Sequence, residues 1–483
     1  MKVIYISSEV NPFASTGGLA DVSAALPMAL SMAGLSVTRI MPLYRQVWEG
    51  SFNLQDTGLH LDIPVGFRTH RADVWIHEDS EVPTYFIRRD EYFDRRELYS
   101  LPERDYDDNF ERFTFFQKAA VALIDALDFG ADIVHSNDWQ GGLIPAFLRE
   151  GTSSLGRTGG EKGEKSVFTI HNLAYQGIFP GTDFAYTNLP FACFSMEEGM
   201  EFYGNVNCMK GGIAMADLVT TVSPRYAEEI QTPEFGCGLD GVLSKVSSRL
   251  KGILNGVDYS LWDPRIDPNL VKRYSSKDLS GKKKCKKDLL KVMGLATDDL
   301  KRPVVGMVTR MVDQKGFDLL SKAMPELMNT GINFILLGSG QVEYHEIARK
   351  WAGTWPRRFA VKIGYDDELA HKIEAGADIF LMPSKFEPCG LNQLYSLRYG
   401  TLPVVHAVGG LVDTIADISV DGNQGNGFVF TEYTPAALIE SVNRAIKLYG
   451  TSEWEKIQKR AMSSDYSWQN SASEYISAYE SLL

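Results

Sequence analysis

Short apolar runs recur along the chain, and most of them end in a polar or glycine-containing loop that leads into a helix-like stretch. One such run covers residues 377–383. It is followed by the turn KFEPCGLN at residues 385–392 and by a Leu- and Tyr-rich stretch that extends to residue 399. A short apolar run bounded by turn residues is typical of a buried strand. Strands that alternate with helices predict an α/β fold built on a parallel sheet.

The N-terminal stretch shows the same order of elements. Residues 3–7 and 37–41 are apolar runs, and between them lie the glycine-containing loop STGGLADV at residues 15–22 and a helix-like stretch at residues 22–33. This order predicts a βαβ unit with a right-handed crossover. Residues 50–95 are richer in β-branched and aromatic residues, which predicts an added antiparallel excursion.

The chain of 483 residues is too long for a single hydrophobic core. The strand–loop pattern restarts after residues 254–258, so the second half is predicted to be a doubly wound domain of its own. Two similar α/β halves favour a ligand cleft between them. The predicted strands of the second half cover residues 304–308, 334–337, 360–363, 377–383 and 402–405.

Charge and cysteine content exclude several classes of function. The net charge of −13 argues against nucleic acid or an anionic membrane as the main partner. Five scattered Cys residues without a CxxC pair indicate free thiols in a reducing compartment. No apolar run is long enough to span a bilayer, and no signal-peptide pattern precedes the first strand. Residues 151–165 are rich in Gly, Ser and Lys, which predicts a surface loop.

Glu387 lies on the predicted turn between a strand and a helix. In an open parallel sheet, ligands bind at the carboxyl ends of the strands, and free N–H groups at a helix start attract an anion such as a diphosphate. A carboxylate beside such a site suits the hydroxyls of a nucleotide sugar. The alternative from this stretch alone is an ordinary capped turn with a Glu near the helix dipole.

Arg310 and Lys315 lie on one loop after another predicted strand. Two cations on such a loop suit a diphosphate that gains charge as a bond breaks. The alternative is a solvated basic loop.

Asp138, Trp139 and His171 also follow predicted strands. A carboxylate next to a large aromatic ring suits sugar binding, with the hydroxyls hydrogen-bonded and the ring stacked. The alternatives are an N-cap Asp with a core Trp and a core His. Gly17 and Gly18 allow a ligand to approach the backbone closely.

Several motifs are absent from the sequence. There is no GxGxxG fingerprint, no Walker GxxxxGK[ST] loop and no Gly-x-Ser-x-Gly elbow. No His, Asp or Glu grouping has the spacing of metal ligands, so neither a metal nor a cofactor is expected.

Taken together, these stretches resemble the bacterial glycogen synthases and plant starch synthases, which are ADP-glucose-dependent transferases of the GT-B fold. The resemblance covers nearly the whole chain, and its motifs follow the family's order. They are STGGLADV at residues 15–22, HSNDW at 135–139, TIHN at 169–172, FYG at 202–204, TTVSP at 220–224, TPEFG at 232–236, LNGVD at 254–258, residues 310–316 and FEPCGL at 386–391.

The resemblance implies two Rossmann-like doubly wound domains that face a central cleft. The N-terminal domain, on the acceptor side, is expected to cover residues 1–255 and to be completed by a C-terminal helix at residues 465–483. The C-terminal domain, on the donor side, is expected to cover residues 256–464.

The implied reaction is a retaining transfer of glucose from ADP-glucose to the non-reducing 4-hydroxyl of an α-1,4-glucan. Glu387 would bind the donor glucose, Arg310 and Lys315 would neutralise the diphosphate, and Asp138 and His171 would hold the sugar. The other implied donor contacts are Ser15, Gly17, Gly18, Tyr365 (stacked on the adenine), Cys389, Gly390, Leu391 and Asn392, and the implied acceptor contacts are Phe93, Asp94 and Trp139.

The chain departs from the family pattern at Ser15, where Lys is usual, and at Asn392, where Thr is usual. Ser15 leaves UDP-glucose open as an alternative donor. Two other functions also stay open: a retaining GT-B transferase with a different donor or a small acceptor, and a non-catalytic glucan-binding homologue. The expected location is the cytoplasm of a bacterium, or the plastid stroma for a mature plastid chain.

Overall fold

The computed structural model describes residues 1–78, 81–101, 104–151, 163–418 and 424–483. The chain divides into two compact units. Unit 1 comprises Met1–Gly256 and Trp468–Leu483, and unit 2 comprises Val257–Ser467. The surface loop predicted at residues 151–165 lies largely outside the described residues. Within the described ranges, no helix has both the length and the apolar composition needed to cross a bilayer.

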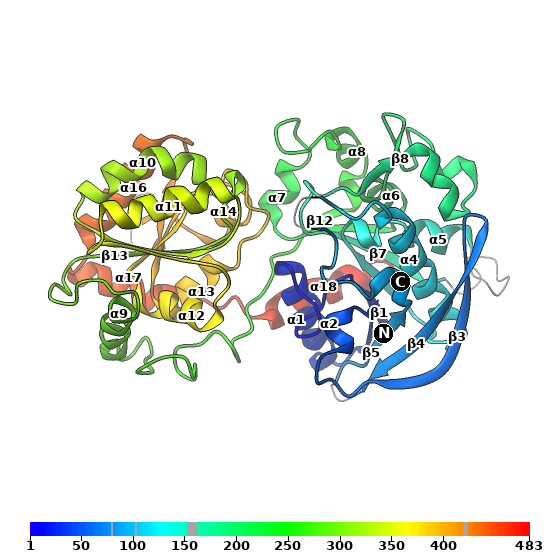
Figure 1. Ribbon diagram of the computed structural model, residues 1–483, viewed down its shortest axis with the longest axis horizontal. Coiled ribbons are helices and arrows are strands. Elements are labelled where there is room, and N and C mark those ends of the chain that lie inside the picture. Colours follow the sequence, from blue (N-terminus) through cyan, green and yellow to red (C-terminus); the bar gives the residue numbers. More distant parts are fainter. Residues whose placement is uncertain (79–80, 102–103, 152–162, 419–423) are drawn as a thin grey trace. The chain divides into compact units, whose positions relative to one another are not determined.

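Unit 1 is built on a nine-stranded sheet with the order β12-β11-β7-β6-β1-β2-β5-β4-β3 (Figure 1). The strands from β12 to β5 pair in parallel, whereas β4 pairs antiparallel with β5 and with β3. The predicted antiparallel excursion is therefore confirmed. The strands are β1 (Lys2–Ile6), β2 (Ser36–Pro42), β3 (Gln55–Val65), β4 (Arg68–His77), β5 (Thr84–Arg88), β6 (Ile133–Asn137), β7 (Lys165–Ile170), β11 (Leu218–Thr221) and β12 (Leu250–Gly252).

Both faces of this sheet are buried. Along β1, Val3 and Tyr5 pack into one apolar cluster, whereas Ile4 and Ile6 pack into another on the opposite face. Alternate side chains of a strand point to opposite faces, so a strand covered on both sides is apolar throughout. This explains why β1 is a continuous apolar run in the sequence.

Helices and a small second sheet complete unit 1. The second sheet has the order β8-β10-β9, with β8 (Ile178–Pro180), β9 (Glu201–Phe202) and β10 (Asn205–Asn207). The α-helices are α1 (Gly18–Met32), α2 (Arg45–Trp48), α3 (Asp90–Phe93), α4 (Asn109–Ala126), α5 (Ile144–Glu150), α6 (Cys208–Met215), α7 (Pro224–Glu229), α8 (Asp240–Lys245) and α18 (Trp468–Glu480).

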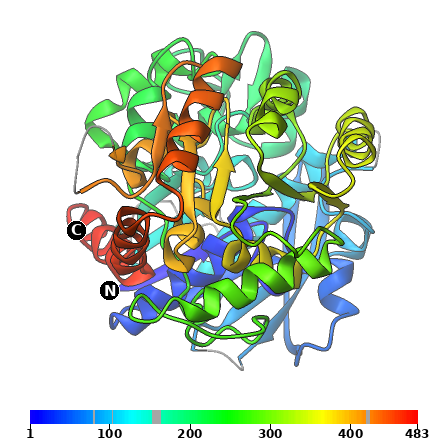
Figure 2. The ribbon, with the colours of Figure 1, turned by 90° about the vertical axis from the view of Figure 1, so that its left-hand side faces the viewer.

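The C-terminal helix α18 belongs to unit 1 although unit 2 precedes it in the chain. It lies beside α1, as Figures 1 and 2 show. Tyr475 and Tyr479 are fully buried in the cluster that contains Val3 and Tyr5. The Tyr479 hydroxyl lies 2.7 Å from His135 Nδ1, which ties α18 to β6.

Replacing Tyr479 with Ala is expected to lower the free energy of unfolding of unit 1 by about 3–5 kcal/mol, because a fully buried aromatic ring is lost. The hydrogen bond to buried His135 is lost as well. Urea unfolding followed by circular dichroism measures the effect. Gln469→Ala, at an exposed position of the same helix, should change stability by less than about 0.5 kcal/mol. Equal stability of the two variants would contradict a core role for α18.

Unit 2 contains a six-stranded sheet with the order β15-β14-β13-β16-β17-β18. All of its pairings are parallel. The prediction of two doubly wound α/β sheets is therefore confirmed. The strands are β13 (Val304–Val308), β14 (Asn333–Gly338), β15 (Phe359–Ile363), β16 (Ile379–Met382), β17 (Leu402–His406) and β18 (Phe428–Phe430).

Helices cover both faces of the unit 2 sheet (Figure 1). One face carries α10 (Phe317–Asn329), α11 (Val342–Thr354), α14 (Gly410–Thr414) and α16 (Pro435–Leu448); the other carries α9 (Ser280–Val292), α12 (Asp367–Gly376), α13 (Asn392–Tyr399) and α17 (Ser452–Ser463). A parallel sheet covered in this way leaves the loops at the carboxyl ends of its strands as the place for a ligand.

Candidate active site

In unit 2 the candidate site lies at the carboxyl ends of β13 and β16, where the strand order reverses. β14 lies on one side of β13 and β16 on the other. The Lys385 N–H donates to the Gln314 carbonyl oxygen at 2.9 Å, so the two following loops are bonded to each other. Gly316 has φ +79°, and a Cβ there would lie 2.1 Å from the Pro383 oxygen. A residue with a side chain could not bring these loops so close.

This arrangement pairs Lys315 with Glu387. Lys315 Nζ lies 2.6 Å from Glu387 Oε2 and 2.9 Å from Oε1. The Ser384 hydroxyl donates to Glu387 Oε2 at 3.0 Å. Glu387 is 5% exposed. From the sequence, Glu387 and Lys315 are predicted as separate sugar and phosphate contacts, and the structure shows in addition that each holds the other in place.

Arg310 is exposed on the same loop as Lys315. Its Nη2 donates to Gln314 Oε1 at 3.2 Å. The arginine thus extends outward while the lysine is held inward, so the loop presents two cations in different surroundings.

The turn after β16 brings backbone close to backbone. Gly390 has φ +72°, and a Cβ at Gly409 would lie 1.9 Å from the Glu387 carbonyl oxygen. Leu391 occupies the N-cap position of α13, and its apolar side chain cannot accept a hydrogen bond from the first-turn N–H groups. These N–H groups therefore suit an anionic ligand.

In unit 1 the sheet order reverses between β1 and β6, since β2 lies on the other side of β1. Asp138 directly follows β6 with φ +49°. Its Oδ1 accepts the N–H of His171, which follows the neighbouring strand β7, at 2.8 Å. The structure therefore brings together Asp138 and His171 from separate parts of the sequence.

Burial shifts the pKa values of both Asp138 and His171. Burial raises the pKa of Asp138 to about 7, although the hydrogen bonds from the N–H groups of His171 and Asn172 oppose this shift. Burial lowers the pKa of His171 to about 3, so its ring is neutral at pH 7. Asn137 Nδ2 donates to the Ile6 oxygen, so its Oδ1 accepts from His171 Nε2 at 2.9 Å. His171 Nδ1 is then an acceptor.

The glycine-containing loop after β1 is held by Glu9. One carboxylate oxygen accepts the Thr16 N–H at 2.5 Å and the other accepts the Thr16 hydroxyl at 2.7 Å. Ser15, Gly17 and Gly18 are exposed beside it. Glu9 was not singled out from the sequence. Its place after the first strand is the same signal that marked Asp138 after β6.

The comparisons with known proteins agree with this geometry. The family model described as starch synthase catalytic domain matches residues 2–245, and the model described as glycosyl transferases group 1 matches residues 296–463. The glycogen synthase of Syntrophotalea carbinolica is 43% identical, with 99% of this chain and 98% of the relative covered. That of Anaeromyxobacter dehalogenans strain 2CP-1 is 45% identical, with 100% and 99% covered. The chain belongs to the glycogen and starch synthase family.

A solved structure supports the same assignment for this synthase-family chain. The catalytic domain of starch synthase IV from Arabidopsis thaliana, bound to ADP and acarbose, aligns with a TM-score of 0.90 and 32% identity, with 99% of each chain covered. A sucrose-phosphate synthase from Thermosynechococcus elongatus, with a TM-score of 0.61 and 18% identity, shares the fold.

Three of the predicted ligand contacts have side chains that pack against other parts of the protein, and they stay predictions. The Phe93 ring is fully buried, and Cys389 is 5% exposed. The Trp139 ring packs edge-on against Phe113 with centroids 5.0 Å apart, and a Cβ at Gly177 would lie 2.7 Å from its face. The Trp139 ring is part-buried, so one part of it stays accessible.

Three other predicted contacts lie at the surface or support a loop. Tyr365 is 90% exposed, and its hydroxyl donates to Asp367 at 3.3 Å. Asp94 is paired with Arg45 at 2.6 Å. The Asn392 amide donates to the Val308 oxygen at 2.6 Å, so it fixes the end of β13. The ring of Tyr365 stays a predicted adenine contact.

Proposed function

We propose that the protein is a retaining glucosyltransferase that moves glucose from ADP-glucose to the non-reducing 4-hydroxyl of an α-1,4-glucan. The observation that carries the proposal is the pair of part-buried Lys315 and buried Glu387 at the strand reversal of unit 2. A cation and a carboxylate held there suit a diphosphate and the sugar attached to it. Membership of the glycogen and starch synthase family supports the same reaction.

Each unit has a part in this reaction. In unit 2, Lys315 and Arg310 stabilise the charge that develops on the diphosphate, and the N–H groups near Gly390 and Leu391 bind its distal phosphate. Glu387 binds the hydroxyls of the glucose. A diphosphate is a good leaving group when cations are present, so no general acid is needed to break the bond.

The polar groups of unit 1 act on the sugar. Asp138 accepts hydrogen bonds from glucose hydroxyls through the oxygen that His171 leaves available. The neutral His171 ring adds an acceptor at Nδ1. Gly17 and Gly18 let the donor approach the backbone closely, and Ser15 replaces the usual lysine of the family at this place.

One assay separates the candidate functions. Radiolabelled ADP-glucose and UDP-glucose are each incubated with glycogen, with maltotriose, or without acceptor. Incorporation from ADP-glucose into glycogen is the expected result. Faster transfer from UDP-glucose would identify UDP-glucose as the donor. Transfer only to a small acceptor would place the protein in a different class of transferase. Binding of glucan without any turnover would favour the non-catalytic homologue.

The activity of the protein is expected to rise between pH 6 and pH 8. The pKa of Asp138 is raised to about 7 by burial, so its carboxylate becomes a full acceptor above that pH. The pH profile of kcat/KM for ADP-glucose measures this ionisation in the free enzyme. Asp138→Asn should lower the activity and remove the transition. A transition near pH 7 that persists in Asp138→Asn would assign it to another group.

Chelators are expected to leave the rate unchanged, because the cations that face the diphosphate are Arg310 and Lys315. The rate is measured with and without EDTA, on enzyme that has been passed through a chelating resin. Activity lost in EDTA and restored by a divalent cation would contradict this reading.

A further inference from the structure

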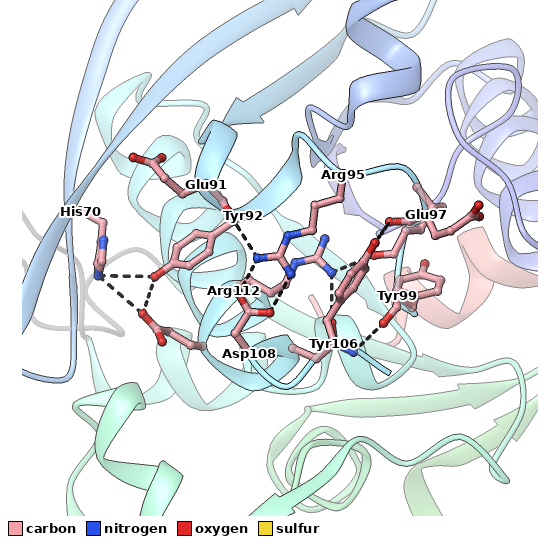
Figure 3. A network of polar contacts seen from close by, with 12 residues as sticks. His70, Glu91, Tyr92, Arg95, Glu97, Tyr99, Tyr106, Asp108 and Arg112 are labelled. Carbon is pink, nitrogen blue, oxygen red and sulfur yellow. Dashed lines mark hydrogen bonds and ion pairs between the residues drawn. The ribbon is translucent and has the colours of Figure 1, made fainter. Parts of the chain in front are cut away.

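Buried Arg112 on α4 binds the segment that lies between the predicted acceptor residues and α4 (Figure 3). Arg112 on α4 is 0% exposed. Its Nη1 donates to the Leu98 oxygen at 2.8 Å and to Asn109 Oδ1 at 3.0 Å. Asn109 Nδ2 in turn donates to the Tyr99 oxygen at 2.9 Å. The first turns of α4 thus fix the backbone at Leu98 and Tyr99.

A second arginine fixes the start of the same segment. Arg95 binds both carboxylate oxygens of Asp108, at 2.7 and 2.5 Å, and its Nη2 donates to the Glu91 oxygen at 3.0 Å. Its guanidinium lies 4.6 Å from the centroid of the Tyr106 ring. The next residue, Arg96, is exposed. The segment therefore has an anchored inner edge and an outer edge open to a ligand.

Tyr99 connects this segment to the glycine-containing loop. Its hydroxyl donates to Glu9 Oε1 at 2.7 Å and lies 2.8 Å from Ser8 Oγ. Glu9 also accepts the N–H and the hydroxyl of Thr16. We call this chain of contacts the Tyr99–Glu9–Thr16 relay. It joins two segments that lie about 80 residues apart in the sequence.

The carboxylate at the centre of the relay makes the two ends depend on each other. Glu9 is 4% exposed, and a buried carboxylate is costly unless its oxygens accept hydrogen bonds. Tyr99 and Thr16 together supply three of these bonds. If Tyr99 moved away, the Glu9 carboxylate would lose one of these hydrogen bonds. Its preferred position would then change, and with it the position of Thr16, which precedes Gly17 and Gly18.

We propose that the Tyr99–Glu9–Thr16 relay couples binding of the glucan to binding of the nucleotide. Tyr99 and Glu9 are positioning residues in this proposal, which rests on the proposed function. A glucan on the outer edge of the Asp94–Arg96 segment holds Tyr99 against Glu9, and Glu9 then fixes Thr16 and the two glycines in the position that receives the donor. Linkage requires the nucleotide to tighten glucan binding by the same factor.

The coupling is measured by calorimetric titration of ADP in the absence and presence of a saturating maltooligosaccharide. The wild-type protein is expected to bind ADP at least about 5-fold more tightly with the glucan present, which is the lower end of ordinary coupling. Tyr99→Phe removes only the hydroxyl and should bring this ratio to within about 2-fold of one.

Matched variants separate the relay from general packing. Tyr92→Phe removes a hydroxyl from the far side of the same network, where it donates to Glu111 at 2.6 Å (Figure 3), and it should keep the wild-type ratio. Thr16 is exposed, so its variants should fold. Thr16→Ala should reduce the ratio, and Thr16→Ser, which restores the hydroxyl, should recover it.

The possible outcomes are distinct. A wild-type ratio of one, or a Tyr99→Phe ratio equal to that of the wild type, overturns the relay while the proposed function stands. If Tyr99→Phe does not fold, the Thr16→Ala and Thr16→Ser pair decides the question. A wild-type protein that binds neither ADP nor the maltooligosaccharide overturns the proposed function instead.

Discussion

Glu387→Gln is expected to lower kcat by about 10³-fold, the upper end of what one charge-stabilising group contributes. The amide keeps the volume of the side chain but removes the negative charge that faces the donor sugar. That charge matters because positive charge develops on the sugar ring as the glycosidic bond breaks. The rate is measured with saturating ADP-glucose and glycogen, and folding is checked by thermal unfolding.

The glutamine variant is a sharper test than an alanine variant. From the sequence, Glu387 was expected on the turn between a strand and a helix. The structure shows a side chain that is 5% exposed and bonded to Lys315 and Ser384. Alanine would leave Lys315 without this partner and could disturb the loop. The control is Glu432→Gln, at an exposed position in the same unit. A near-normal kcat in Glu387→Gln would show that the Glu387 charge has no part in the mechanism.

Arg310→Ala and Lys315→Ala are each expected to lower kcat by about 10²-fold. Both cations act on charge that grows as the diphosphate leaves, so the loss falls on the transition state more than on ground-state binding. Steady-state kinetics with varied ADP-glucose separates kcat from KM. Lys350→Ala removes an exposed lysine elsewhere in unit 2 and should have little effect. A change in KM alone would show that the cations bind both states equally.

The substitutions of Lys315 and Arg310 should differ in how their effects on kcat combine with that of Glu387→Gln. Lys315 is bonded to Glu387 at 2.6 Å, so the losses in the double variant should be far from additive. Arg310 contacts Gln314, and its loss should add more nearly to that of Glu387. Additive losses for Lys315 and Glu387 would mean that the pair does not act as a unit.

The alternation of apolar strands with helices was sufficient to predict the fold. Each central strand is buried on both faces, as Val3 and Ile4 show on β1, so it leaves an uninterrupted apolar run in the sequence. The loops at the strand ends were predictable for the same reason, because polar residues such as Asp138 and Arg310 stand out after such runs. The function of the family came from resemblance to its motifs.

Side-chain partners could not be predicted in this way. The contact of Lys315 with Glu387 joins residues 72 positions apart, and that of Glu9 with Tyr99 joins residues 90 apart. Contacts between residues so far apart in the sequence produce no periodicity and no motif. The burial of individual side chains was not predictable either: the resemblance implies an acceptor contact at Phe93, and the Phe93 ring is fully buried. Nothing in the sequence indicated that Arg112 is buried, because a fully buried arginine is uncommon.

The return of α18 to unit 1 affects how the chain folds during synthesis. Residues 1–256 leave the ribosome without the helix that covers Val3, Tyr5 and His135, whereas unit 2 is continuous in sequence. At ordinary translation rates the gap before Trp468 emerges lasts roughly 10–40 s. During that time α1 covers only part of this face of the nine-stranded sheet, and the apolar part that α18 later covers is exposed. Unit 1 is therefore a natural client for chaperones, and unit 2 can reach its native state first.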